Sequence, residues 1–210
     1  MMKKLKQKEA VPLPIAAPER GVRADAQRNL DTLLRSAMEL FATEGVDVPV
    51  RTIAEKAGVG IGTLYRHFPQ RADLIAAVFQ REISALADHA ISLADSAEPG
   101  DALVEWVGRY ASLVATKHGL APALHSDSPS MEKLRAHFWE RVRPALRPLL
   151  DAAIAAKQVR ADVGVDDLLE AVASLCMPAH DGRAGYSQRM ISVLVDGLRA
   201  GANVAPARSK

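Results

Sequence analysis

The feature that most constrains the chain is a pair of short helical patterns within residues 50–68, separated by a glycine-rich turn. Four apolar residues of the first pattern recur at i, i+3, i+4 and i+7, which puts them on one face of a helix of about two turns. They are Val50, Ile53, Ala54 and Ala57. Gly58 follows at once, and glycine accepts the left-handed conformation that ends a helix. Two helices packed across a tight turn are therefore expected.

The second pattern predicts a helix that begins near Ile61 and shows a polar and basic face to solvent. Leu64 and Phe68 fall on its inward side. The outward positions are Gly62, Thr63, Arg66 and His67, with Tyr65 at the boundary. Hydroxyl and cationic groups on an exposed helix can bond the phosphate oxygens of DNA. The segment thus indicates a DNA-binding helix-turn-helix, although two packed helices of an ordinary bundle would show the same spacing.

Charge gives this interpretation only modest support. The chain has 210 residues and a formal net charge of +2, and 49% of its residues are hydrophobic, which is enough for a sizeable core. Residues 1–71 hold 12 Lys and Arg against 8 Asp and Glu, whereas the remainder is net negative. Most of this excess lies in the first 22 residues, and residues 23–71 carry seven basic and six acidic side chains. This charge distribution favours a polyanionic partner near the N-terminus. The support comes more from the first 22 residues than from the helical region at 23–71.

Residues 1–23 are expected to form a disordered basic arm. Three prolines interrupt the apolar patch that a secretion signal would need, namely Pro12, Pro14 and Pro18. The single cysteine, Cys176, cannot form an intramolecular disulfide, which fits a reducing compartment. No apolar run approaches the ~18 residues of a membrane span. We therefore expect a cytoplasmic protein.

Nearly every other segment has the periodicity of a helix, so the predicted fold class is all-α. We expect a three-helix DNA-binding domain at residues 24–71, a larger helical ligand-binding and dimerisation domain at 72–203, and a flexible tail at 204–210. The helices expected after the helix-turn-helix cover about residues 71–94, 101–117, 131–159, 165–177 and 186–199. Pro144 and Pro148 each remove a backbone donor, which predicts a kink or a break in the third of these helices.

Three motifs occur in order and at suitable spacing. They are Ser36-Ala37-Met38-Glu39-Leu40-Phe41 with Gly45, Ile53-Ala54-Glu55-Lys56-Ala57-Gly58-Val59, and Gly62-Thr63-Leu64-Tyr65-Arg66-His67-Phe68 with Leu74. Together they resemble the N-terminal domain of the tetracycline-repressor (TetR) family of bacterial transcription regulators, over about residues 24–79. The resemblance implies a ligand-responsive repressor that binds a palindromic operator as a homodimer. It also implies that a small-molecule effector in the C-terminal domain releases the protein from DNA.

The resemblance also implies a set of DNA-binding residues. Thr63, Tyr65, His67 and Arg71 match positions that contact phosphates, and Arg51, Ile61 and Gly62 match positions that reach base edges. The full predicted set is Arg51, Thr52, Gly60, Ile61, Gly62, Thr63, Tyr65, Arg66, His67 and Arg71. Independently of the family, the Arg51 fork suits guanine, and Ile61 can contact a thymine methyl group. Arg71 stands where lysine is commonest in the family, which keeps the charge and changes the geometry.

An effector site is expected among the bulky side chains of the C-terminal part. The predicted lining residues are Trp106, Tyr110, His118, Leu124, Phe138, Trp139 and Met177. Aromatic and Met side chains beside interrupted helices can line a mostly apolar cavity with a few polar anchors. For each residue taken singly, ordinary core packing is the simpler explanation. The last helix carries an apolar face that suits either a partner helix of a dimer or an intrachain neighbour.

A second class of function remains open. The near-neutral charge of residues 23–71 would also fit a helical carrier of small molecules, or a partner-binding module, without DNA affinity. An enzyme is not expected, because Cys176 with His180 and Asp181 is the only combination that suggests a nucleophile, and a lone buried thiol is the commoner outcome. No metal or cofactor is expected, since His118, His125 and His137 lack the spacing of a metal site.

Overall fold

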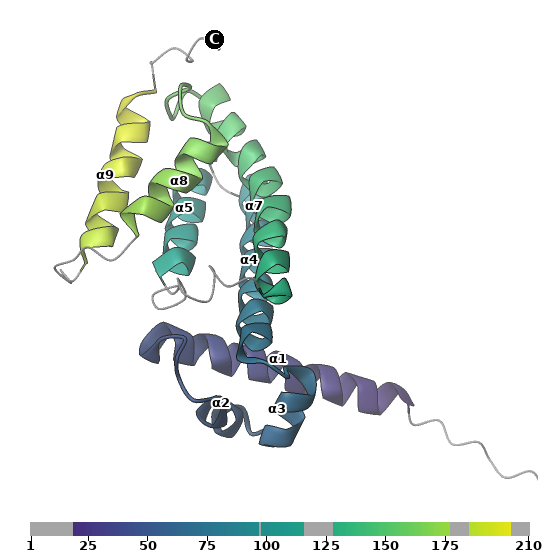
Figure 1. Ribbon diagram of the computed structural model, residues 1–210. Coiled ribbons are helices and arrows are strands. Elements are labelled where there is room, and N and C mark those ends of the chain that lie inside the picture. The colour runs from purple at the N-terminus through teal and green to yellow at the C-terminus, as the bar shows by residue number, and fades with distance from the viewer. Residues whose placement is uncertain (1–18, 97, 116–127, 177–184, 203–210) are drawn as a thin grey trace, which may run out of the picture.

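The computed structural model describes residues 19–96, 98–115, 128–176 and 185–202, and shows an all-α protein (Figure 1). The helices are α1 (Glu19–Glu44), α2 (Val50–Ala57), α3 (Ile61–His67), α4 (Arg71–Ser96), α5 (Pro99–Ala115), α7 (Pro129–Ala155), α8 (Val165–Leu175) and α9 (Tyr186–Ala200). These ranges contain no strand. Among the described helices, none is long and apolar enough to cross a membrane.

Helices α1, α2 and α3 form a small unit, the headpiece, at the lower end of the molecule in Figure 1. Leu33, Ala37 and Phe41 are the buried stripe of α1 and face this unit's core. Helix α1 begins at Glu19, earlier than the domain start expected at residue 24. The extra turns have no apolar stripe, so the periodicity of the sequence could not reveal them. Residues 1–18 of the predicted arm and the tail at 204–210 lie outside the described residues.

Helix α4 is one 26-residue rod that joins the headpiece to the rest of the molecule, the body. Its predicted apolar positions are buried, among them Leu74, Phe79 and Leu86. The Phe79 ring stacks on the Phe41 ring of α1 with centroids 6.5 Å apart and planes 9° from parallel. Farther along, the same rod packs most extensively against α7 and also against α5. Helix α4 therefore contributes buried residues to the core of the headpiece and to that of the body.

Helix α7 continues through both prolines, so the chain does not break there, and a kink, the other expectation for this segment, stays a prediction. Pro144 and Pro148 are both exposed and lie one turn apart on the outer face of the helix. The carbonyl groups that lose their intrahelical partners therefore face water. On the opposite face, Val142, Leu146 and Leu149 are buried in the core. Packing of this apolar face outweighs two missing hydrogen bonds on the wet side.

Helix α9 forms the side of the body farthest from α4 and α7 in Figure 1, and α8 lies between, packed against α5, α7 and α9. They match the two helices predicted at 165–177 and 186–199 to within two residues. The backbone N–H of Arg160 donates to the carbonyl of Leu198 at 2.9 Å, and Arg199 of α9 pairs with Asp101 of α5. Gly201 ends α9 as expected. The last helix is thus fixed to the body at its C-terminal end.

Candidate nucleic-acid interface

The turn between α2 and α3 is closed by backbone hydrogen bonds around one left-handed glycine. Gly58 has φ +68°, and its N–H donates to the carbonyl of Glu55 at 3.1 Å. The N–H of Val59 donates to the carbonyl of Ala54 at 3.0 Å. This pair of bonds is a Schellman motif, which satisfies the last carbonyls of α2 and turns the chain sharply. A residue with a side chain at position 58 would be strained, so the turn depends on glycine.

Helix α3 is almost entirely outside the core. It starts where the Gly60 carbonyl accepts from the N–H groups of Thr63 and Leu64, at 2.9 and 3.2 Å. Leu64 is its one buried residue. Ile61 is 38% exposed and Tyr65 51% exposed, so Tyr65 is not the core aromatic that its boundary position allowed. Ile61 and Tyr65 lie one turn apart, so their exposed side chains share one face of α3.

Two glycines of this surface have no structural need to be glycine. Gly60 and Gly62 lie outside the positive-φ region. A Cβ atom at Gly62 would meet nothing within 4 Å, and one at Gly60 would meet only the Thr63 hydroxyl oxygen at 3.9 Å. Glycine within a helix costs about 1 kcal/mol relative to alanine. The open space over the first turn of α3 therefore suits the close approach of a surface from outside the chain.

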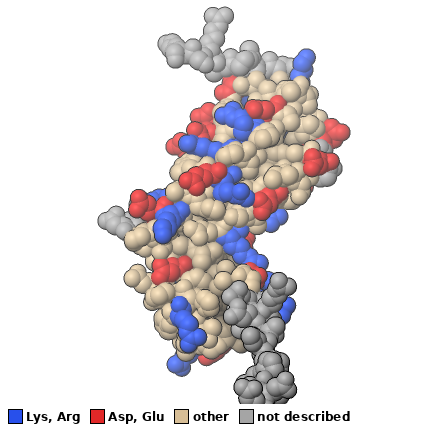
Figure 2. Space-filling view, turned by 90° about the vertical axis from the view of Figure 1, so that its right-hand side faces the viewer, with Lys and Arg blue, Asp and Glu red and all other residues tan. Residues whose placement is uncertain are grey.

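The remaining predicted contact residues flank this open turn. Arg51 is exposed and Thr52 half-buried in the first turn of α2, while Thr63, Arg66 and His67 are exposed on α3. Lys56 of α2 pairs with Glu39 of α1 at 2.9 Å, a contact that the sequence did not predict. Acidic and basic side chains intermix over the face drawn in Figure 2, which has no broad surface of one sign.

Arg71 differs from the other predicted contacts. It is half-buried at the start of α4, and its Nη2 donates to the carbonyl of Val46 and, at 2.7 Å, to that of Val48. Both carbonyls belong to the loop between α1 and α2. The phosphate contact inferred for Arg71 stays a prediction, beside a structural contact that the sequence did not indicate.

Four of the predicted effector residues form a chain of ring contacts in the body. Trp106 stacks on Tyr110 with centroids 5.7 Å apart, Tyr110 lies 6.0 Å from Phe138, and Phe138 meets Trp139 edge-on at 5.0 Å. Trp106 and Tyr110 are buried, whereas Trp139 is 45% exposed beneath the guanidinium of Arg143. The other three predicted residues, His118, Leu124 and Met177, lie outside the described residues.

The polar atoms of the buried rings have partners within the protein. The indole Nε1 of Trp106 donates to the carbonyl of Leu86 at 3.1 Å, and the hydroxyl of Tyr110 donates to that of Leu169 at 3.4 Å. Burial raises the pKa of Tyr110 far above its ordinary value. Burial also raises the pKa of the Cys176 thiol, which makes this cysteine a poor nucleophile. Trp106 and Tyr110 are therefore core residues that can at most form the floor of a ligand site.

A groove of about 380 Å³ runs between α8 and α9 on the outside of the body. Its apolar lining includes Leu168 and Ala171 of α8 and Val193, Leu194 and Gly197 of α9. Val193 is 62% exposed, and a Cβ atom at Gly197 would meet nothing within 4 Å. An exposed apolar side chain thus stands beside an unfilled hollow on the same helical face.

Comparison with known proteins agrees with this geometry. Residues 33–78 match the family model of bacterial regulatory proteins of the tetR family, and residues 98–200 match that of the C-terminal domain of SbtR-like transcriptional regulators. An HTH-type transcriptional regulator of Staphylococcus aureus is 39% identical over 69 residues, which are 32% of this chain and 37% of that protein. The chain thus spans little more than a third of the length of that curated relative.

Two solved structures cover far more of the chain. A TetR transcriptional regulator of Streptomyces coelicolor is 35% identical with a TM-score of 0.66, and the match covers 80% of this chain and 97% of that one. A TetR transcription regulatory protein of Mycobacterium vanbaalenii is also 35% identical with a TM-score of 0.66, covering 85% of this chain and 99% of that one.

The headpiece and its exposed α3 define a DNA-binding transcription regulator of the helix-turn-helix class. Matches in both domains and two solved relatives place the chain more narrowly: it belongs to the TetR family of bacterial transcriptional regulators. Family membership also agrees with the prediction of a regulator and not an enzyme. The family resemblance read from the three sequence motifs is thereby confirmed.

Proposed function

We propose that the protein is a transcriptional repressor that binds a palindromic operator as a homodimer and is released from it by a small-molecule effector. The observation that carries this proposal is the exposure of α3, on which every residue except Leu64 lies outside the core. The helix is nevertheless fixed at both ends, by the Gly58 turn before it and by α4 after it. A rigid helix held away from the core suits insertion into the major groove of DNA.

The exposed groups divide into positioning and reading contacts. Thr63, Tyr65 and His67 supply hydroxyl and imidazole groups for phosphate oxygens, which fix the protein's register on the duplex. Arg51 is the direct reader, because its planar fork pairs with O6 and N7 of guanine for about 1–3 kcal/mol of discrimination. The open space over Gly62 lets the backbone of α3 come close to the bases. Gly60 and Gly62 have no side chain that could contact base edges, so sequence specificity depends on few residues.

The groove between α8 and α9 supports the homodimer. A two-fold axis through this groove would set the exposed Val193 of each copy against the same face of the other, so that one patch serves both sides of the interface. Burial of such an apolar face is the usual source of stability in a permanent dimer. The axis then relates the two α3 helices, which must lie about 34–36 Å apart to enter successive major grooves.

A hydrogen-bond path supports communication between the effector domain and the headpiece. Ser130, in the first turn of α7, donates its hydroxyl to Asp73 Oδ1 of α4 at 2.5 Å. The other oxygen of Asp73 accepts the N–H of Gln70 at 3.0 Å, in the turn that follows α3. Helix α7 also carries Phe138 of the ring cluster. An effector that binds better to a conformer with displaced α7 would shift the population away from the DNA-binding pose.

Selection of bound sequences from a pool of random duplexes tests the proposal. We expect an enriched inverted repeat whose half-sites are about one helical turn apart, and an affinity that falls steeply with salt. Enrichment of a single unrepeated site would contradict the dimeric mode. Absence of salt-dependent binding at low ionic strength would contradict DNA binding and favour a carrier or partner-binding module.

A further inference from the structure

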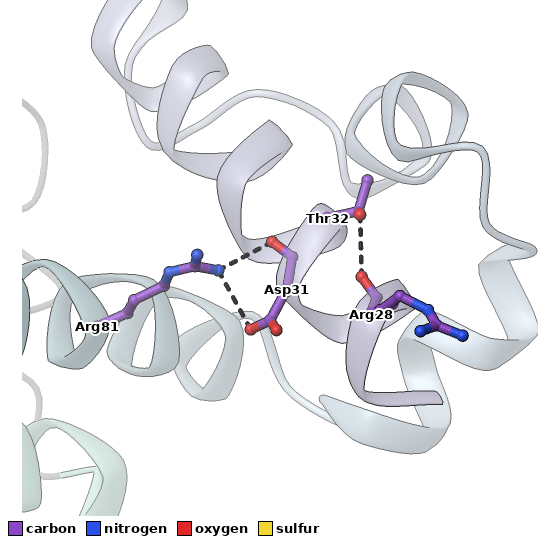
Figure 3. Close-up of polar contacts among 4 residues, drawn as sticks. All are labelled: Arg28, Asp31, Thr32 and Arg81. Atoms are coloured by element: carbon purple, nitrogen blue, oxygen red, sulfur yellow. Dashed lines mark hydrogen bonds and ion pairs between the residues drawn. The ribbon is translucent and has the colours of Figure 1, made fainter. Parts of the chain in front are cut away.

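Two arginines of α4 hold the headpiece through its backbone carbonyl groups. Near the middle of α4, Arg81 Nη1 donates to the carbonyl of Asp31 in α1 at 2.9 Å, and lies 3.4 Å from the Asp31 carboxylate (Figure 3). At the start of α4, Arg71 Nη2 donates to the loop carbonyls of Val46 and Val48. We name these contacts the two-arginine clamp. Its acceptors are separated from the arginines by 23 to 50 residues in the sequence.

The clamp contacts lie at two well-separated points. Ten residues of α-helix divide Arg71 from Arg81, which is about 15 Å along the rod. Arg81 binds a turn of α1, where Thr32 also donates to the Arg28 carbonyl at 2.9 Å (Figure 3). Arg71 binds the loop after α1. The Phe41–Phe79 stack joins the same two helices. An apolar stack alone allows sliding and rotation, whereas directional bonds at separated points oppose both.

The acceptors also explain why arginine is used at both places. A backbone carbonyl moves only when the main chain moves. A hydrogen bond to it therefore fixes the position of the main chain and not only that of a side chain. The guanidinium group presents several N–H donors in a rigid plane, and one Nη2 of Arg71 serves two carbonyls at once. A lysine ammonium has no such fixed fork. The arrangement is therefore suited to fix an orientation and not only to hold two surfaces together.

We propose that Arg71 and Arg81 are positioning residues that fix the pose of the headpiece on α4, and so set which spacing of operator half-sites the dimer accepts. The proposal rests on the dimeric operator binding proposed above. Each base pair added between half-sites moves them apart by about 3.4 Å and changes their relative rotation. A clamped headpiece tolerates little of this change, whereas a loosened headpiece can follow it.

The first experiment measures affinity for operators whose half-site spacing is changed by one base pair in either direction. We expect Arg81→Gln to reduce the preference for the best spacing by about two- to thirtyfold, the range of mutations that modulate coupling at a distance. Arg81→Lys should restore part of it. Asp31→Asn should resemble the wild type, because the backbone acceptor at 2.9 Å remains. Arg147→Gln on α7 is the matched control, an exposed arginine outside the headpiece that pairs with Asp151 of its own helix.

Salt dependence separates positioning from direct phosphate contact. A phosphate contact by Arg71 would make Arg71→Gln weaken all spacings alike and lower the salt slope by about one. The clamp predicts an unchanged slope and a broader spacing profile. Spacing profiles of Arg71→Gln and Arg81→Gln equal to that of the wild type would overturn the inference while leaving operator binding intact.

A measurement without DNA tests the clamp even if operator binding fails. Spin labels at Arg66→Cys on α3 and Asp95→Cys on α4, both exposed positions, report the pose within one chain by their distance distribution. The clamp predicts a narrow distribution in the otherwise unchanged protein and a wider one with Arg81→Gln. Equally narrow distributions would contradict it. Far-ultraviolet circular dichroism confirms that each variant remains folded, and Arg81→Gln alone tests the clamp where Arg71→Gln does not fold.

Discussion

Helices α3 and α5 both carry aromatic side chains, but α3 exposes them and α5 buries them. Tyr65 of α3 is 51% exposed, whereas Tyr110 of α5 is 3% exposed and donates its hydroxyl to a buried carbonyl. Helix α3 buries one residue, and α5 buries a full face that includes Trp106. The comparison teaches that stability and recognition reside on different helices. Changes on α5 should alter folding, and changes on α3 should alter binding.

The largest expected effect comes from breaking the buried side of this comparison. Trp106→Ala removes a fully buried ring and its hydrogen bond to the Leu86 carbonyl. We expect the free energy of unfolding to fall by about 3–5 kcal/mol, because the cavity cannot collapse fully. Urea denaturation measures it. A loss below about 1 kcal/mol would mean that the core relaxes around the site or that Trp106 is not part of it.

The second effect concerns the outer face of the body, which belongs neither to the buried face of α5 nor to the exposed surface of α3. Val193→Asp places a charge at a side chain that is 62% exposed in the single chain and buried in the proposed dimer. Burying an unpaired charge costs about 3 kcal/mol or more, so we expect dimerisation to weaken by roughly 100-fold or more. Analytical ultracentrifugation measures this, with Ser192→Asp as a neighbouring exposed control. A dimer of unchanged affinity would place the interface elsewhere.

The elements that sequence could predict are those with strong local signals. The apolar stripes of α4, α8 and α9 placed these helices to within about two residues, and Gly58 located the turn before α3. The exposure of α3 followed from Leu64 and Phe68 as its inward positions. Local propensity was misleading at Pro144, because whether a proline breaks a helix depends on which face is buried, and packing decides that.

The contacts that hold the site in place could not be predicted from the sequence. Arg81 meets a backbone carbonyl 50 residues away, and backbone acceptors leave no trace in residue type. Arg71 gave a signal, a cation at the start of a helix, but the same signal fits a phosphate contact and a loop contact. The bond from Ser130 to Asp73 likewise joins segments 57 residues apart. Tertiary geometry, and not local pattern, determines these roles.

A smaller effect is expected on the exposed side. Tyr65→Ala should weaken operator binding by about 1–3 kcal/mol, or roughly five- to 150-fold, and leave the free energy of unfolding within about 0.5 kcal/mol of the wild type. Fluorescence anisotropy with the selected duplex and urea denaturation give the two numbers. Tyr110→Phe provides the reciprocal control, with loss of a buried hydrogen bond and no change in the contact surface. Equal loss of stability in both variants would contradict the division between α3 and α5.

The smallest expected effect gives the most closely matched comparison of α3 with α5. Gly62→Ala and Gly108→Ala both replace a helical glycine whose Cβ would meet nothing within 4 Å, one on α3 and one on α5. Each should stabilise its helix by up to about 1 kcal/mol. Only Gly62→Ala should weaken operator binding, because its methyl group occupies the space into which DNA fits. Unchanged binding by Gly62→Ala would mean that DNA does not approach this turn closely.

Cleavage of the operator by an iron chelate attached to α3 tests the central claim most directly. The chelate is attached at Arg66→Cys, and the one native cysteine, Cys176, is buried. The account predicts two clusters of strand cleavage, one in each half-site and about one helical turn apart, and none when the chelate is attached at Arg147→Cys on α7. Operator that stays intact beside α3, or that is cut from α7 instead, would contradict the assignment of α3 as the DNA-reading helix.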